Sequence, residues 1–179
     1  MEKTAGLLYN GEKIKPETDR TEKDKPMEIR TLTDRTEKQR AARTVLEALQ
    51  EWFEVTEYRE DYIRESGDLP FFAAFDGEKP VGFLCLKETG RDTAELHVMG
   101  VMKEYHRKGL GRKLFEKAKE AAAESGYSFL QVKTVKMGCY PDYDDTNRFY
   151  LSLGFKEFEV FPLLWDEANP CQVYVMSLR

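Results

Sequence analysis

The amino-acid sequence predicts a mixed α/β domain with a central sheet of about six to seven strands flanked by about four helices. Two observations predict this fold. Short apolar segments of strand length alternate with segments whose apolar residues recur at helical spacing. Some strand segments are joined by tight turns, such as Asp76-Gly77, so the sheet contains hairpins and is mixed rather than purely parallel.

Composition places the chain among globular proteins. Its 179 residues are 41% hydrophobic and 12% aromatic, which suits one domain with a sizeable core. The net charge of −5 argues against a nucleic-acid surface, which needs a basic footprint. No apolar run approaches the roughly 20 residues that cross a bilayer. The polar N-terminus shows no secretory signal, so we expect a cytoplasmic protein without membrane contact.

Cysteine and histidine residues are few. The three cysteines, Cys85, Cys139 and Cys171, lack CxxC spacing and are expected to be reduced thiols rather than a disulfide framework or zinc site. Only two histidines are present, His97 and His106, which further weakens a metal site. We therefore expect no metal.

The first 25 residues are expected to form an extension before the domain. Asn10-Gly11 is typical of a tight hairpin, and both a hairpin and a disordered segment remain open there. Pro26 marks the boundary, so the domain is expected to span residues 26–179.

The first half of the domain is expected to hold a strand, two helices and three further strands. Met27–Leu32 is the first strand, and Thr36 is the expected N-cap of a helix with apolar residues at helical spacing. A second helix is expected to begin near Trp52 and to close near Gly67. The strands that follow are Phe71–Phe75, Val81–Lys87 and Thr93–Val101.

The second half is expected to hold two helices and three strands. A long amphipathic helix starts near Leu110 and stops at Gly126. A short helix capped by Asp144 or Asp145 ends at Gly154. The strands around them are Phe129–Val135, Phe155–Phe161 and Gln172–Leu178.

The most informative segment joins a strand to the long helix. The strand ends at Val101, a short basic loop follows, and Gly109 and Gly111 open the helix. Free N–H groups and a partial positive charge at a helix N-terminus suit a phosphate, and glycines let a pyrophosphate approach the backbone. An ordinary helix start with solvated basic residues has the same pattern. The basic residues are Arg107, Lys108 and Arg112.

Two familiar phosphate motifs are excluded. No GxxxxGK followed by Ser or Thr is present, and Leu114 stands where a dinucleotide fingerprint needs its third glycine. The remaining match is Gln/Arg-x-x-Gly-x-Gly/Ala, with His106 in place of Gln or Arg. In this motif the chain resembles the GNAT family of N-acetyltransferases, and the order of elements from residue 27 onward is similar as well.

The resemblance implies acetyl-CoA as co-substrate. Family members contact the pantetheine arm through the strand before the loop, where Met99 and Val101 stand, and Gly100 suits a strand that splays there. They bind the pyrophosphate through the loop, which here comprises His106, Arg107, Lys108, Gly109, Leu110, Gly111 and Arg112.

Acetyl transfer also needs a neutral amine. Only about one molecule in a few thousand of a lysine-like amine with pKa about 10.4 is neutral at pH 7, so a base is worthwhile. Glu95 lies eleven residues before His106, where many family members place a general base. We expect Glu95 to act as the base or to position a water; a structural hydrogen-bonding role and an exposed strand position are the alternatives. Strand alternation predicts that Glu95, His97, Met99 and Val101 share one face, with His97 as a relay, an alternative base or a core histidine.

Tyr150 is the expected acid; the alternative is an aromatic side chain that packs on the sheet with its hydroxyl reaching water. Tyr150 lies four residues before Gly154-Phe155, where family members commonly carry a tyrosine whose hydroxyl faces the CoA sulfur. Asn147, one turn earlier, is expected to contact the CoA arm. The asparagine that the family often has seven residues before the tyrosine is replaced by Tyr143.

The acceptor side implied by the family involves the first two helices and the loops near the last strands. Aromatic residues there, with acidic neighbours such as Asp142 and Glu167, favour a small cationic amine. The candidates for substrate contact are Trp52, Tyr58, His97, Tyr140 and Trp165. A protein or peptide acceptor, and a non-catalytic acyl-CoA-binding module, are the alternatives. A homodimer, frequent in the family, is also open.

Overall fold

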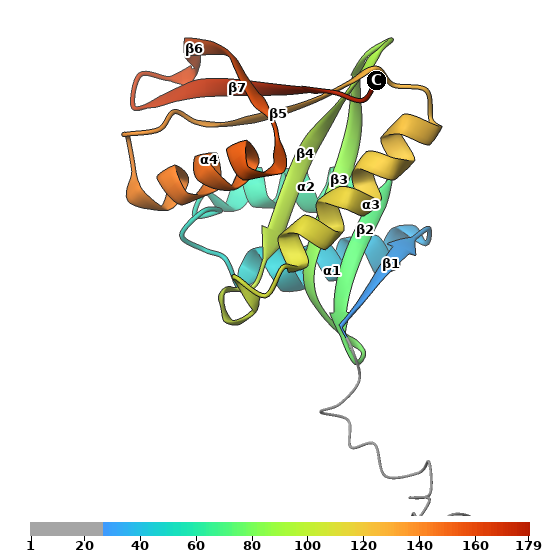
Figure 1. Cartoon of the computed structure of the whole chain (residues 1–179). Coiled ribbons are helices and arrows are strands. Elements are labelled where there is room, and N and C mark those ends of the chain that lie inside the picture. The colour runs from blue at the N-terminus through green and yellow to red at the C-terminus, as the bar shows by residue number, and fades with distance from the viewer. Residues whose placement is uncertain (1–26) are drawn as a thin grey trace, which may run out of the picture.

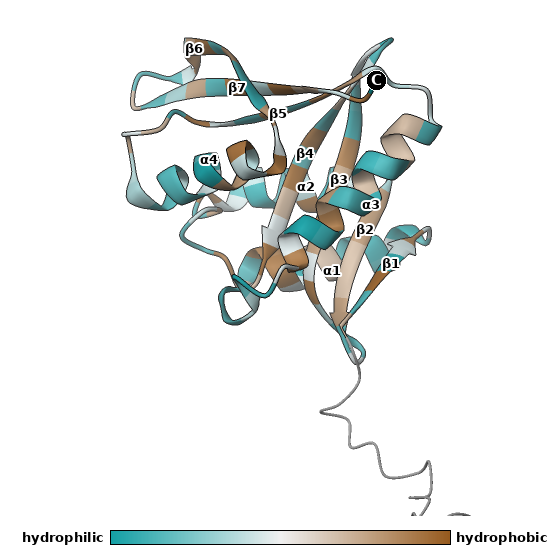
Figure 2. Cartoon of the chain, in the orientation of Figure 1, coloured by the Kyte–Doolittle hydropathy of each residue, from teal (hydrophilic) through white to brown (hydrophobic). Residues whose placement is uncertain are grey.

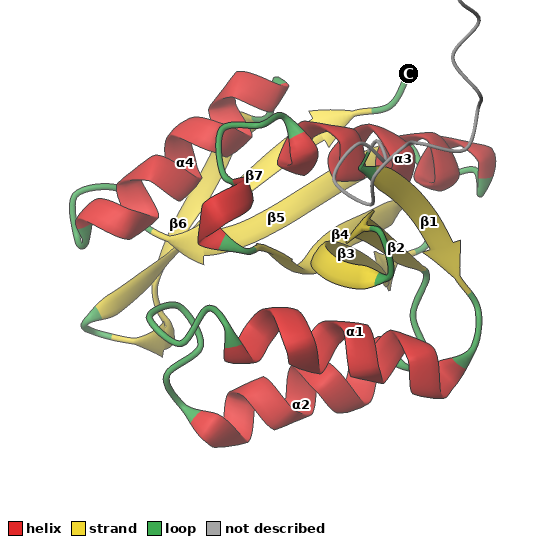
Figure 3. Ribbon diagram, turned by 90° about the horizontal axis from the view of Figure 1, so that it is seen from below, coloured by secondary structure: helices red, strands yellow, loops and turns green. Residues whose placement is uncertain are grey.

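The computed structural model describes residues 27–179, which form one seven-stranded sheet with helices on both faces (Figure 1). The strands are β1 (Glu28–Leu32), β2 (Phe71–Asp76), β3 (Lys79–Gly90), β4 (Thr93–Val101), β5 (Phe129–Val135), β6 (Lys156–Asp166) and β7 (Asn169–Ser177). The helices are α1 (Arg35–Glu47), α2 (Thr56–Ser66), α3 (Leu110–Glu124) and α4 (Pro141–Leu153). Helices α1 and α2 cover one face, and α3 and α4 lie on the other (Figure 3). The predicted mixed α/β fold is confirmed.

The sheet has one parallel junction, between β4 and β5, in the order β1-β2-β3-β4-β5-β7-β6. These two strands pair only at Thr93↔Phe129, Ala94↔Leu130 and Glu95↔Gln131. Beyond Glu95, β4 runs on to Val101 while β5 continues as a partner of β7. The sheet therefore opens between the two strands on the C-terminal side of Glu95.

The core lies between the first four strands and the helices that cover them. Val45 and Leu46 of α1 and Leu114 of α3 are fully buried against opposite faces of the sheet. Strands β2 and β3 are apolar in long runs because both of their faces are covered (Figure 2). This two-sided core gives the open edge of β4 a rigid support.

Two helix starts differ from the prediction. The N-cap of α1 is Asp34 rather than Thr36, because the Asp34 carboxylate accepts the N–H of Glu37 at 2.8 Å. Helix α2 begins at Thr56 rather than near Trp52, so Trp52 belongs to the loop between the first two helices.

The start of α4 also differs from the prediction. The helix begins at Pro141, whose fixed φ and missing N–H suit the first helical position. Asp144 therefore lies inside the first turn instead of capping it, and its carboxylate accepts the N–H of Gly138 at 2.7 Å.

A β-bulge interrupts β4 at His97. Cys85 of β3 pairs with Val98, but the next residue, Leu86, pairs with Leu96, so His97 has no partner on β3. An extra residue of this kind breaks the alternation of side chains between the two faces of a strand.

The predicted shared face is wrong beyond this bulge. The His97 ring bonds Glu65 of α2, whereas the Met99 Cε lies 3.3 Å from the place that a Cβ on Gly111 of α3 would occupy. Because α2 and α3 cover opposite faces, Met99 and Val101 lie on the α3 face, opposite His97.

The predicted N-terminal extension and its hairpin lie outside the described residues, and the domain boundary at Pro26 stays a prediction. Within residues 27–179, no helix is both long enough and apolar enough to cross a membrane.

Candidate active site

The opening between β4 and β5 exposes main-chain groups of β4. The N–H of Met102 donates to the Val81 oxygen on β3 at 2.9 Å. Successive peptide groups of a strand point to opposite sides, so those of Met99 and Val101 point away from β3 and into the opening. Consistent with this, the Val101 carbonyl is reached by Nε2 of His106 at 2.6 Å.

The loop that follows β4 presents a run of amides at the start of α3. Gly109 is the N-cap residue and has φ +79°, a left-handed conformation that favours glycine. Arg107 has φ +59°. Among residues 27–179, the amides of 107–112 find no acceptor, and this concentration of donors suits an anion.

Gly111 has a packing role that the motif alone did not indicate. A Cβ at this position would lie 3.0 Å from Cζ of Phe149 and 3.3 Å from Cε of Met99. The missing side chain lets α3 approach α4 closely. Arg112 strengthens this contact, because its guanidinium donates to the Ser152 carbonyl at 3.0 Å.

The other two basic residues of the loop are accessible to solvent. Arg107 is 90% exposed and lies 3.8 Å from the Asp145 carboxylate of α4. Lys108 places its Nζ 4.9 Å from the centre of the Tyr105 ring. Both charges are therefore near the amide run without being fixed by a close ion pair.

Glu95 is buried at the point where β4 and β5 separate. Its carboxylate forms an ion pair with Lys133 of β5 and accepts from the Gln131 amide at 3.0 Å. The sequence-predicted base thus already has two partners, both on the neighbouring strand.

His97 lies two residues along β4 and contacts α2. Its Nε2 is 2.9 Å from Glu65 Oε2, and the Lys87 Nζ is 2.8 Å from the same oxygen. The Tyr62 ring meets the imidazole edge at a centroid distance of 5.4 Å. Burial, reinforced by the charge of Lys87 and opposed by Glu65, lowers the pKa of His97 below 6.5.

Tyr150 is buried on α4 among other aromatic rings, including Phe155 and Tyr174. Burial raises the pKa of its hydroxyl well above the ordinary value of 10, so the phenol is neutral near pH 7. Among the described residues, this hydroxyl forms no hydrogen bond. A neutral phenol with an unused proton suits the role of an acid.

Asn147 is fully buried one turn before Tyr150. Its Nδ2 donates to the carbonyls of Val135 at 2.9 Å and Tyr143 at 2.6 Å, and its Oδ1 accepts the Tyr174 hydroxyl at 2.6 Å. These bonds anchor α4 to β5 and β7. The expected contact with a cofactor stays a prediction, and the structure gives this side chain an anchoring role.

The remaining acceptor candidates do not gather at one point. The Trp52 ring lies 6.3 Å from the His106 ring, next to the amide run. Tyr58, Tyr140 and Trp165 are exposed on α2, before α4 and at the end of β6. No ring contact joins these three to one another in the part of the chain that the structure describes.

Sequence reasoning missed several residues of the site. Glu65 follows Tyr62 by three residues and therefore shares its side of α2. Gln131 and Lys133 are partly exposed positions that alternate with the buried apolar residues of β5. Both patterns are visible in the sequence, but neither indicates which strand or helix lies opposite. The missed residues are Glu65, Lys87, Gln131, Lys133 and Tyr174.

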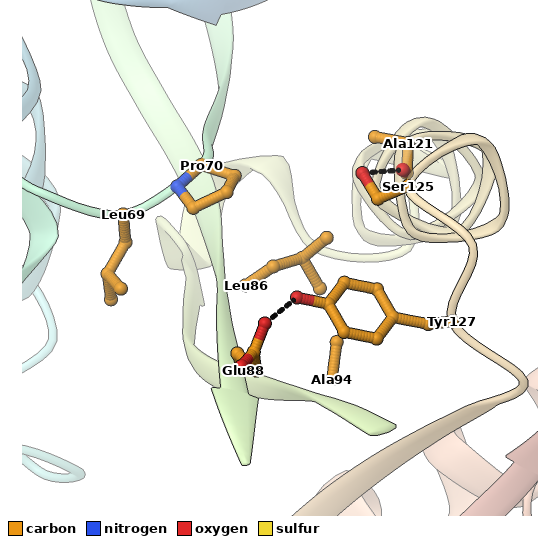
Figure 4. Close-up of a pocket in the computed structure, with 8 residues that line it drawn as sticks. All are labelled: Leu69, Pro70, Leu86, Glu88, Ala94, Ala121, Ser125 and Tyr127. Carbon is orange, nitrogen blue, oxygen red and sulfur yellow. Dashed lines mark hydrogen bonds between the residues drawn. The ribbon is translucent and has the colours of Figure 1, made fainter. Parts of the chain in front are cut away.

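A separate apolar pocket of about 230 Å³ lies between the sheet and the last turns of α3 (Figure 4). It is lined by Leu86, Ala94 and Ala121 among others, and the Tyr127 hydroxyl donates to Glu88 beside it at 2.7 Å. Because it lies at the opposite end of α3 from Gly109, it belongs to a different region from the opening. Within residues 27–179, no three His, Cys, Asp or Glu side chains gather as metal ligands.

A family comparison explains this arrangement. The sequence profile of the Acetyltransferase (GNAT) family matches residues 34–155, more than half of the chain. The chain belongs to the GNAT family. The uncharacterized N-acetyltransferase YsnE of Bacillus subtilis is 26% identical to it over 102 residues. That match covers 57% of this chain and 66% of the relative, slightly less than two thirds.

Solved structures show the same GNAT fold. A predicted acetyltransferase of the GNAT family from Desulfovibrio desulfuricans is 19% identical and has a TM-score of 0.71, over 86% of this chain and all of that one. The predicted acetyltransferase yncA from Salmonella typhimurium, determined with its cofactor acetyl-CoA, is 17% identical with a TM-score of 0.68. This match covers 87% of this chain and 95% of that one.

Proposed function

We propose that this GNAT protein is an acetyl-CoA-dependent N-acetyltransferase that transfers acetyl directly to an amine in a ternary complex. The observation that carries the proposal is the opening between β4 and β5, which ends at the free amides that begin α3. The Salmonella yncA structure, which has the same fold and holds acetyl-CoA, supports it.

The residues present fit this co-substrate. The amides of 107–112, with Arg107 and Lys108 beside them, would hold the pyrophosphate. The main-chain groups of Met99 and Val101 would pair with the amide groups of the pantetheine arm, as an added strand would. His106 would have to share the Val101 carbonyl with that arm or release it.

The chemistry needs two proton transfers. The thioester of acetyl-CoA supplies an activated acetyl group. The amine nitrogen forms a bond to the acetyl carbon, the bond from that carbon to sulfur breaks, and the amine loses a proton while the sulfur gains one. Tyr150, as a neutral buried phenol, would donate the proton to the sulfur.

Two residues of β4 could assist the amine. Glu95 is the proposed base or the residue that positions a water. Lys133 and Gln131 both donate to its Oε2, while Oε1 has no hydrogen-bond partner among the described residues. Protonation would weaken the ion pair with Lys133, which favours holding a water at Oε1 over acting as the base. His97 is the second candidate and is considered below.

The acceptor is proposed to be a small cationic amine. The exposed rings of Tyr58, Tyr140 and Trp165 offer faces for a cation. Two acidic residues of this region already accept hydrogen bonds from nearby backbone: Asp166 from the N–H of Asn169, and Asp144 from the N–H of Gly138. Recognition of the cation would therefore depend mainly on the rings. A peptide amine is the alternative, favoured by the exposed edge strand β6.

Calorimetric titration with acetyl-CoA, with CoA and NAD beside it, tests the binding step. We expect binding of acetyl-CoA and CoA but not NAD. Gly109→Ala should weaken binding because φ +79° disfavours alanine, whereas Gly90→Ala, in open space without a positive φ, should bind as the wild type does. A wild-type chain that binds no acetyl-CoA would refute the proposed function.

A thiol-release assay then tests the acceptor. Small cationic amines and peptides with free amines are compared at saturating acetyl-CoA. Release with small amines supports the favoured acceptor, and release with peptides alone supports the alternative. Binding without release from any amine supports a non-catalytic module. Sedimentation of the purified chain tests the homodimer proposed from the family resemblance.

A further inference from the structure

The contact between His97 and Glu65 fixes which nitrogen of the imidazole carries a proton. The hydrogen bond with Lys87 lowers the pKa of Glu65, so its carboxylate is ionised near pH 7 and can only accept. The only donor in the 2.9 Å contact is therefore the imidazole, through its Nε2–H.

This tautomer leaves Nδ1 of a neutral His97 with a free lone pair. Among residues 27–179, Nδ1 has no hydrogen-bond partner. The His97 side chain is 13% exposed, so solvent and a ligand can reach part of the ring. The arrangement is that of a base oriented by a carboxylate on its far side.

The ring of His97 lies on the side of the sheet that α2 covers, and α2 also carries the acceptor candidate Tyr58. The charged and titratable groups that face the ring are Tyr62 and Glu65 from α2, Lys87 from β3 and Glu95 on β4 itself. The bulge at His97 turns the ring toward α2, away from Met99. His97 would thus lie on the α2 side of the sheet, opposite Met99 and the start of α3.

Glu95 is less suited to accept the proton. Taking up a proton would weaken the ion pair between its carboxylate and Lys133, whereas Nδ1 of His97 can take one and keep the bond from Nε2 to Glu65. We propose that His97 takes the proton from the acceptor amine and that Glu65 is its positioning residue. This inference rests on the proposed N-acetyltransferase function.

The proton movements balance. The amine forms its bond to the acetyl carbon and gives one proton to Nδ1, which produces an imidazolium bonded to Glu65 through Nε2. The carbon–sulfur bond breaks, and the sulfur takes the Tyr150 proton. His97 then releases its proton to solvent and Tyr150 regains one, so amine and thioester become amide and thiol.

Nuclear magnetic resonance of the ¹⁵N-labelled full-length chain tests the geometry without any substrate. The chain has two histidines, so the exposed one is assigned with His106→Asn. We expect His97 at pH 7.5 to be neutral with its proton on Nε2, and to titrate below pH 6.5. A proton on Nδ1, or an equal mixture of the two tautomers, would overturn the inference.

Two variants should move the titration of His97 in opposite directions. Glu65→Gln removes a charge that favours the imidazolium, so the His97 midpoint should fall further. Lys87→Gln removes a charge that disfavours it, so the midpoint should rise. Glu60→Gln is the matched control, because Glu60 lies on the same helix but pairs with Arg43. Midpoints that do not move in either test variant contradict the positioning role of Glu65.

Kinetics with an accepted amine complete the test. His97→Gln should lower kcat roughly 10²-fold or more while the Kd for acetyl-CoA stays unchanged. In Glu65→Gln, the acid limb of kcat/KM should move to lower pH, in step with the His97 midpoint. Wild-type kcat in His97→Gln overturns this inference alone. Failure of the wild type to bind acetyl-CoA overturns the proposed function, and this inference with it.

Discussion

Replacing Asn147 with alanine removes three hydrogen bonds at once from the buried side of α4. The amide of this fully buried side chain joins the carbonyls of Val135 and Tyr143 to the hydroxyl of Tyr174. A net contribution of about 0.5–1.5 kcal/mol for each bond gives a loss of about 3 kcal/mol in the free energy of unfolding. For a chain of this size, that corresponds to a fall of about 6–12 °C in Tm.

Urea unfolding followed by circular dichroism measures the loss, and a double-mutant cycle locates it. Tyr174→Phe removes the partner of Oδ1, so the two changes together should cost about 1 kcal/mol less than the sum of the single changes. Asn169→Ala is the control, because this amide bonds Asp166 near the surface of the β6–β7 turn and should cost less than Asn147→Ala.

The same variant tests an anchoring role and a cofactor contact by separate measurements. If Asn147 also contacts the CoA arm, as the sequence predicted, Asn147→Ala should weaken acetyl-CoA binding even at temperatures well below the Tm of the variant. If it anchors α4, Tm falls, and turnover falls with it because Tyr150 lies on the same helix. An unchanged Tm would refute the anchoring role.

Three further predictions concern single side chains. Tyr150→Phe should lower kcat roughly 10²–10⁴-fold at an unchanged Kd for acetyl-CoA. Tyr127→Phe loses only its bond to Glu88 and should keep the wild-type kcat. Equal kcat values in the two variants contradict the acid role of Tyr150. Gly100→Ala should lower the free energy of unfolding in urea by about 1–3 kcal/mol, because its Cβ would lie 2.9 Å from the Leu49 Cδ1 methyl in the core. Gly90→Ala, in open space, is the control. Equal stability of the two variants contradicts the close packing at Gly100. Ellman's reagent should titrate only the exposed Cys139 in the native chain. Burial raises the pKa of the Cys171 thiol to about 11 and raises that of Cys85 further, so both stay protonated. Rapid reaction of a second thiol contradicts the burial of Cys85 and Cys171. All three thiols should react after denaturation.

The order of strands and helices could be predicted because hydrophobic periodicity is a local property. The end of α4 at Gly154 could be predicted because a glycine in the left-handed conformation commonly closes a helix. The start of α2 could not be placed as well, because Trp52 continues the apolar pattern into a loop. The bulge at His97 has no marker in the sequence, and it reversed the face of every later residue of β4.

The candidate site was predicted only where a motif or one element defines it. Gly109 belongs to the glycine motif and Tyr150 stands four residues before Gly154-Phe155, so the sequence alone directed attention to both. The partners of Glu95 and His97 were not, because Lys133 and Glu65 lie 38 and 32 residues away along the chain. Such pairs are set by how elements pack together, and no spacing rule within a single helix or strand reaches that far.

The short junction between β4 and β5 divides the molecule into two consecutive stretches of polypeptide. Residues 28–124 supply β1 to β4 with α1 to α3, and residues 129–177 supply β5 to β7 with α4. During synthesis, the ladder of β1 to β4 can therefore close before the ladder of β5 to β7 has been made. The opening arises only when the two ladders meet, so a ligand bound there acts as a brace between them. Such a brace stabilises their docking more than it stabilises either ladder alone.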